Sequence, residues 1–119
     1  MNLKYHKTMT KEKWRSFPFY KQILMIANEL NRAGNWIEKG DFVEVRYCYE
    51  RAFELLYLTI ATLSRKNKLR ELVRFKETLA GLYIKKIPII KENLSLLNVL
   101  VSLDKDSFSF LKVRAGYAK

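Results

Sequence analysis

The sequence predicts an all-α protein, a four- to five-helix antiparallel bundle with short connections. Apolar residues recur at helical spacing through four long segments of the 119-residue chain. Four glycines and two prolines are too few for a turn-rich β-sandwich. Residues 98–103 have the valine content of a strand, but no second strand-like run exists to pair with them. Helices packed against one another are therefore expected.

The first long helix is predicted from about Pro18 to Lys39. The fixed φ of proline suits a first helical turn, so Pro18 marks the start. Gly40 ends the helix, because glycine readily adopts the left-handed conformation after a C-terminus. Asp41 then serves as an N-cap, and Glu44 three residues later completes a capping-box pattern. This tight turn predicts two antiparallel helices.

The second helix is predicted from about residue 42 to 64 and is unusually apolar. Its charged residues Arg46, Glu50 and Glu54 recur every four residues and form one narrow polar stripe, in which Arg46 and Glu50 can pair weakly. The rest of its surface is apolar and must be covered on more than one side. This helix is expected to be central, or also to supply an oligomer interface.

Two further helices complete the expected bundle, one from about residue 69 to 85 and one from Pro88 to about residue 103. A short terminal helix after residue 104 would pack through Phe108, Phe110 and Leu111. The predicted organisation is a flexible basic N-terminal arm (1–16), a helical bundle domain (17–112) and a basic C-terminal tail (113–119).

No residue combination with catalytic or metal-binding spacing is found. His6 is the only histidine and Cys48 the only cysteine, so a Cys/His zinc site cannot be built within one chain. Cys48 lies on an apolar face and is expected to be a small buried hydrophobe. The carboxylates of the first hairpin lack the Glu-x-x-His pattern of dimetal bundles and are interpreted as a solvated face: Glu29, Glu38, Asp41, Glu44, Glu50 and Glu54. We predict no enzyme activity and no cofactor.

The charge suggests one class of partner. Lys and Arg number 23 against 12 Asp and Glu, a formal net charge of +11. Positive charge concentrates in the N-terminal arm, at residues 65–76 and in the tail, and such a balance raises affinity for polyanions. The candidate phosphate-binding patch consists of Arg65, Lys66, Lys68, Arg70, Arg74 and Lys76. A nucleic-acid-associated protein, binding RNA or DNA phosphates, is the alternative function.

Aromatic residues suggest the leading function. Trp36, Tyr47 and Tyr57 fall off the main apolar stripes, and Trp and Tyr at a surface are typical of protein interfaces. We therefore expect a non-enzymatic protein-interaction or scaffold module, whose partner is a second copy in a homodimer or another protein. The chain shows no signal peptide and no apolar run that would span a membrane, which indicates a cytoplasmic protein without a membrane partner.

Overall fold

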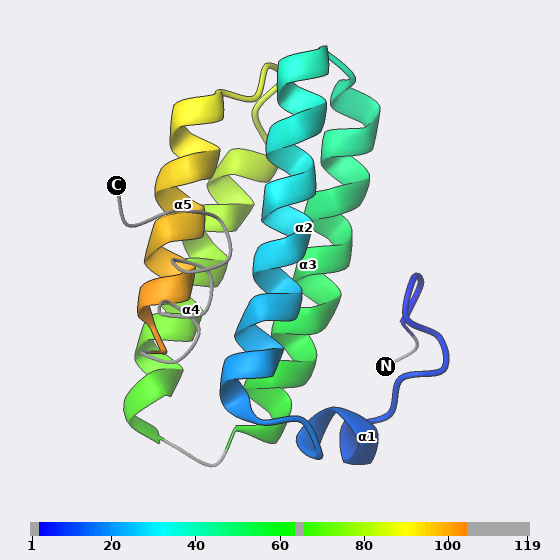
Figure 1. Cartoon of the computed structure of the whole chain (residues 1–119), viewed down its shortest axis with the longest axis vertical. Helices are drawn as coiled ribbons and strands as arrows, with labels where there is room; N and C mark the ends of the chain where they lie inside the picture. The colour runs from blue at the N-terminus through cyan, green and yellow to red at the C-terminus, as the bar shows by residue number, and fades with distance from the viewer. Residues whose placement is uncertain (1–2, 64–65, 105–119) are drawn as a thin grey trace.

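The structure is a computed structural model that describes residues 3–63 and 66–104, without the side chains of residues 66 and 67. The described ranges contain helices and no strand (Figure 1). The prediction of an all-α bundle of four to five helices is confirmed. The helices are α1 (Lys11–Arg15), α2 (Phe19–Lys39), α3 (Phe42–Thr62), α4 (Lys66–Tyr83) and α5 (Ile90–Ser102).

The four long helices run alternately up and down and form a square (Figure 1). Going around the square, α2 packs against α3, α3 against α4, α4 against α5, and α5 against α2. The α2–α3 turn and the α4–α5 loop therefore lie at the same end of the bundle, on opposite edges of the square. The short helix α1 lies at the other end, against α3.

The turn between α2 and α3 has the conformation that the sequence predicts. Gly40 has a φ of 75°, and its N–H donates to the Ile37 carbonyl at 3.0 Å. The Asp41 N–H donates to the Trp36 carbonyl at 3.0 Å, which completes a Schellman motif. Asp41 Oδ1 accepts a hydrogen bond from the Glu44 N–H at 3.2 Å, as an N-cap residue does.

Helix α3 is covered by three other helices, as its apolar surface requires. It packs against α2, α4 and α1. Cys48 is fully buried on the core side, so the prediction of a small buried hydrophobe is confirmed. The buried residues of α3 are Val45, Cys48, Tyr49, Ala52, Leu55, Leu56, Leu58 and Thr59.

One buried polar group joins three helices. The Asn93 side chain on α5 is fully buried; its Oδ1 accepts from the Tyr49 hydroxyl of α3 at 2.7 Å, and its Nδ2 donates to the Leu30 carbonyl of α2 at 2.9 Å. Burial raises the pKa of Tyr49 to about 12, so its hydroxyl remains a donor at neutral pH. Gly34 lies beside this amide, and a Cβ there would lie 3.2 Å from Asn93 Nδ2. Satisfied buried polar groups of this kind specify how helices align.

The helix ends differ from the predicted ones near α4 and α5. Helix α4 begins three residues earlier than predicted, at Lys66, and ends at Tyr83. Helix α5 begins at Ile90 rather than at Pro88, because Ile89 has an extended backbone with a φ of −114° and a ψ of 123°. Residues 84–89 therefore form an open loop. The predicted terminal helix with its three apolar anchors, the domain end at 112 and the tail 113–119 lie outside the described residues.

We expect Gly40→Ala to lower the free energy of unfolding by about 1–2 kcal/mol, because alanine is strained at positive φ. Gly81→Ala is the matched control: Gly81 is helical and exposed, and its added Cβ meets nothing within 4 Å. That control should gain roughly 0.5–1 kcal/mol from helix propensity. Urea unfolding followed by circular dichroism measures both changes, and equal effects of the two substitutions would contradict this account of the turn.

Candidate functional site

The N-terminal segment, residues 3–16, packs against α3 and is not the loosely held arm predicted from its polar sequence. Trp14 of α1 is fully buried, and its Nε1 donates to Thr59 Oγ1 of α3 at 3.1 Å. Gln22 of α2 donates from Nε2 to the Trp14 carbonyl at 2.9 Å. Thr10 caps α1 by accepting from the Lys13 N–H at 3.1 Å. Burial of the Trp14 indole therefore holds this segment against α3, although its lysines had predicted a flexible arm.

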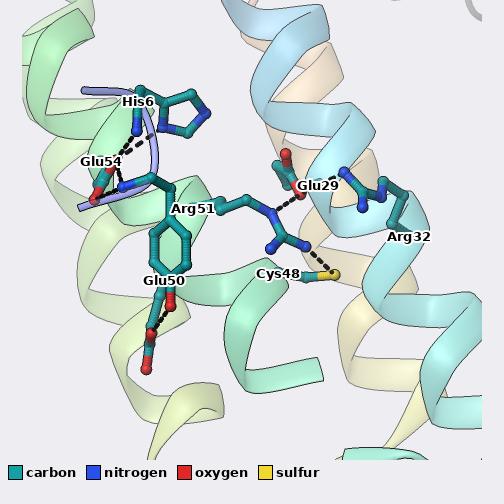
Figure 2. A network of polar contacts seen from close by, with 8 residues as sticks. His6, Glu29, Arg32, Cys48, Glu50, Arg51 and Glu54 are labelled. Carbon is teal, nitrogen blue, oxygen red and sulfur yellow. Dashed lines mark hydrogen bonds and ion pairs between the residues drawn. The ribbon is translucent and has the colours of Figure 1, made fainter. Parts of the chain in front are cut away.

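Glu54 of α3 holds the start of this segment. Its carboxylate accepts backbone N–H groups from Lys4 at 2.6 Å, Tyr5 at 2.9 Å and His6 at 3.0 Å. His6 Nδ1 also lies 2.8 Å from Glu54 Oε1 (Figure 2). Three consecutive amides that converge on one carboxylate form an anion-binding concavity, here filled from within the chain.

Glu50, one turn before Glu54, connects the N-terminal segment to α4. Its carboxylate accepts from the hydroxyl of Tyr5 and, at 2.5 Å, from the hydroxyl of Tyr83. The Arg46 guanidinium lies 4.5 Å from the Tyr83 ring centre, and its Nη2 donates to the Tyr83 hydroxyl at 3.2 Å. Tyr83 thus stands between Arg46 and Glu50, where the sequence suggested a weak direct pair.

A second polar cluster lies on the α2 side of α3. Glu29 is only 7% exposed, and its Oε1 accepts from Arg51 Nε at 3.0 Å and from Arg32 Nη1 at 3.5 Å. Arg51 Nη2 also donates to the Cys48 sulfur at 3.3 Å (Figure 2). The interpretation of the carboxylates as a solvated face is therefore wrong for Glu29, Glu50 and Glu54. The sequence missed them because the partners of Glu50 and Glu54 lie 33–50 residues away along the chain.

These contacts fix the protonation states of the site. Partial burial raises the pKa of Glu50 and of Glu54, but hydrogen bonds from the N-terminal segment, and from Tyr83 to Glu50, outweigh it and leave both pKa values lowered. The hydrogen bond to Glu50, with burial, raises the pKa of Tyr5 to about 12. Burial raises the pKa of the Cys48 thiol. At neutral pH the Glu50 and Glu54 carboxylates are charged acceptors, while the Tyr5 phenol and the Cys48 thiol remain protonated. The states of the carboxylates and the phenol suit groups that hold the N-terminal segment in place.

The three predicted interface aromatics do not form one surface. Trp36 and Tyr57 are partly buried against the core, with Lys39 Nζ 5.0 Å and Lys11 Nζ 5.8 Å from their respective ring centres. Tyr47 is 41% exposed and lies beside Tyr5, with ring centres 6.4 Å apart. Tyr47 and Tyr57 are ten residues apart on α3, about 15 Å along the helix axis. Part of this predicted interface is thus occupied by the N-terminal segment.

The predicted phosphate-binding patch is only partly assembled. Arg70 and Arg74 are exposed one turn apart on α4, so they share a face. Lys76 is exposed but follows Arg74 by two residues, about 200° around the helix. Lys68 Nζ lies 3.9 Å from Glu71 Oε2. Arg65 and the side chain of Lys66 are outside the described part of the chain.

The structure reveals an apolar surface that the sequence reasoning missed, at the bundle end that carries the α2–α3 turn and the α4–α5 loop. Arg46 Nη1 donates to the Tyr83 carbonyl at 3.4 Å, which places the start of α3 beside the end of α4. The isoleucines of residues 84–89 lie outside both flanking helices, whereas the sequence had placed Ile84 in the first of these helices and Ile89 in the second. We call this the apolar end surface; its members and exposed fractions are Ile84 (78%), Ile87 (69%), Val43 (60%) and Ile89 (48%).

A groove of about 530 Å³ separates α4 from α5. Phe75 and Leu82 line it from α4, Leu96 and Val99 line it from α5, and Leu103 lies just beyond the end of α5. Charged groups of both signs also line it, including Arg74 and Glu92, so the groove has no single electrostatic character.

Comparisons with known proteins give no assignment: no protein-family model, no characterised protein and no solved structure matches this chain. Among the helices in residues 3–63 and 66–104, none is long and apolar enough to cross a bilayer. In the same ranges, no three His, Cys, Asp or Glu side chains are grouped as a metal site requires.

We expect Glu54→Gln to release residues 4–6 from α3 and to cost about 1–3 kcal/mol, because bonds to a charged acceptor are replaced by bonds to a neutral one. Hydrogen exchange of the Lys4, Tyr5 and His6 amides measures the release. Glu77→Gln, at an exposed carboxylate of α4, is the control and should leave these amides protected.

The attachment of residues 4–6 to the Glu54 carboxylate should weaken in acid. Because the pKa of Glu54 is lowered in the folded protein, its contribution is present above the ordinary pKa of a glutamate and is lost as pH falls through the lowered value. Glu54→Gln should remove this contribution to the pH dependence of unfolding. An unchanged pH profile in the variant would show that Glu54 does not hold the segment.

Proposed function

We propose that this protein is a non-enzymatic protein-interaction module and that it binds its partner through the apolar end surface. The observation that carries the proposal is the exposure of Ile84 at 78% and Ile87 at 69% on one loop. Single exposed apolar residues are ordinary, but several large ones gathered in one place mark interaction sites. Val43, in the first turn of α3, and Ile89, just before α5, add to this surface at the same end of the bundle.

The fold itself does not require these isoleucines. A fully buried aliphatic side chain contributes about 1.5–3 kcal/mol, whereas one that keeps most of its exposure contributes a small part of that. The core is instead built from the buried faces of the helices, and Ile84 and Ile87 are not among its members. A partner that covers them would supply the missing burial.

The polar groups support a binding role over a catalytic one. Three carboxylates that are buried or partly buried, those of Glu29, Glu50 and Glu54, accept hydrogen bonds from other elements of the fold. Within the described ranges, every buried side-chain nitrogen or oxygen has a hydrogen-bond partner. The lone buried thiol of Cys48 agrees with a reducing compartment such as the cytoplasm, which we propose as the location.

The test is affinity purification of the tagged full chain from the cells that make it, followed by mass spectrometry. Ile84→Asp with Ile87→Asp should abolish recovery of the partner, because two carboxylates replace the exposed apolar contacts. Leu69→Asp, at a 40% exposed leucine near the opposite end of the bundle, is the matched control and should retain it. Thermal unfolding confirms that the double variant is folded. Equal recovery with both variants would refute the proposed surface.

Binding of nucleic acid is a second candidate, favoured by Arg70 and Arg74. Both are exposed on one face of α4, and neither takes part in an ion pair with the described residues. Two guanidiniums one turn apart can contact successive phosphates. This mode of binding requires a rigid helix that displays both guanidinium groups on one face.

Fluorescence anisotropy with labelled single-stranded RNA and duplex DNA tests this candidate. Affinity should fall steeply with salt, and Arg70→Ala with Arg74→Ala should lower the slope of log affinity against log salt by about 2 units. Lys7→Ala with Lys13→Ala removes the same charge from the N-terminal segment and is the control. No binding at low salt, or equal losses in both variants, would exclude the role of α4.

A further inference from the structure

We propose that the partner of the apolar end surface is a second copy of this chain, docked end to end about a two-fold axis. This inference rests on the proposed function, because it names the occupant of the same surface. The two edges of this bundle end carry opposite net charge.

One edge of this end is acidic. Residues 38–44, which span the end of α2, the turn and the start of α3, contain Glu38, Asp41 and Glu44 against the single Lys39, a net charge of −2. Glu38 and Asp41 are exposed. Asp41 also accepts the capping hydrogen bond of α3, which fixes its carboxylate at the tip of the turn.

The opposite edge is basic. Residues 84–92, which form the α4–α5 loop and the start of α5, contain Lys85, Lys86 and Lys91 against the single Glu92, a net charge of +2. Lys85 Nζ lies 2.6 Å from Glu92 Oε1, so this pair is satisfied within the chain. The surplus positive charge is therefore carried by Lys86 and Lys91, which are both exposed.

A two-fold axis that runs between these edges, parallel to both, places the acidic edge of each copy over the basic edge of the other. The same operation brings Val43 of one copy over the Ile84 and Ile87 side of its partner, so apolar groups of the two copies meet within the interface. Such an isologous interface needs one self-complementary patch, and this end provides it. The arrangement follows from the square order of the helices, because the turn and the loop lie on opposite edges.

Charge elsewhere on the molecule disfavours other ways of pairing. The two edges cancel, so the remainder of the chain carries the whole net charge of +11. Two copies that approach through other surfaces are repelled on average, whereas residues 38–44 and 84–92 together carry no net charge and are locally complementary. The neutral end is thus the place where a second copy can dock without like-charge repulsion.

The size of the interface predicts a weak, reversible dimer. A helix with its side chains is about 10–12 Å wide, so the end of a square of four helices offers about 400–600 Å². That is below the roughly 800 Å² per partner of a standard interface. We therefore expect dissociation constants in the micromolar range or above.

Analytical ultracentrifugation of the untagged full chain, from micromolar to near-millimolar concentration, measures this equilibrium. The wild-type chain should shift from monomer to dimer, and Ile84→Asp with Ile87→Asp should remain monomeric. Lys86→Glu should weaken association roughly tenfold, because two-fold symmetry counts each altered contact twice. Glu38→Lys should act similarly, and the double variant Glu38→Lys with Lys86→Glu should recover most of the wild-type affinity.

The recovery in the charge-swapped variant is the decisive result, since loss of folding would not be rescued in this way. A wild-type chain that stays monomeric throughout overturns the inference, as does a dimer that survives the isoleucine substitutions. These failures are distinguishable from failure of the proposed function: a monomer that still captures another protein through Ile84 and Ile87 retains the function with a different partner.

Discussion

The structure depends on one constraint, which is that α3 must be covered almost all the way round. A helix with an apolar surface this broad cannot leave most of it in water, since each exposed large aliphatic side chain forfeits about 1.5–3 kcal/mol of burial. Helices α2 and α4 cover two of its sides, and α1 with the preceding residues covers a third. The square arrangement of the four long helices and the ordered N-terminal segment are two consequences of the same requirement.

The polar stripe of α3 shows how this coverage is made specific. Glu50 and Glu54 lie where the N-terminal segment crosses the helix, and they bind it through backbone amides and the Tyr5 hydroxyl. The same Glu50 reaches the Tyr83 hydroxyl on α4. Trp14 contributes apolar burial to this contact, and the two carboxylates add hydrogen bonds that are directional. Charged groups that the sequence placed in solvent therefore organise the contacts of three elements.

The surfaces that this packing leaves exposed are the ones available for binding. The predicted interface aromatics are divided between core contacts and the N-terminal segment, so they do not provide a continuous docking face. The end of the bundle differs from them in that its isoleucines lie on a loop outside both flanking helices and remain exposed. In the proposed function, this end binds a partner while the closed, hydrogen-bonded body of the bundle serves as a rigid support.

The sequence by itself determined the helical class, the Gly40–Asp41 turn, the coverage of α3 on more than one side and the burial of Cys48, because helical periodicity and capping are properties of neighbouring residues. It did not determine what faces the charged stripe, since Glu54 meets residues about 50 positions away. It also placed the start of α5 two residues early and so left the apolar loop unnoticed. Only the tertiary structure decided which side chains share a surface, because such contacts depend on how separate helices align in space.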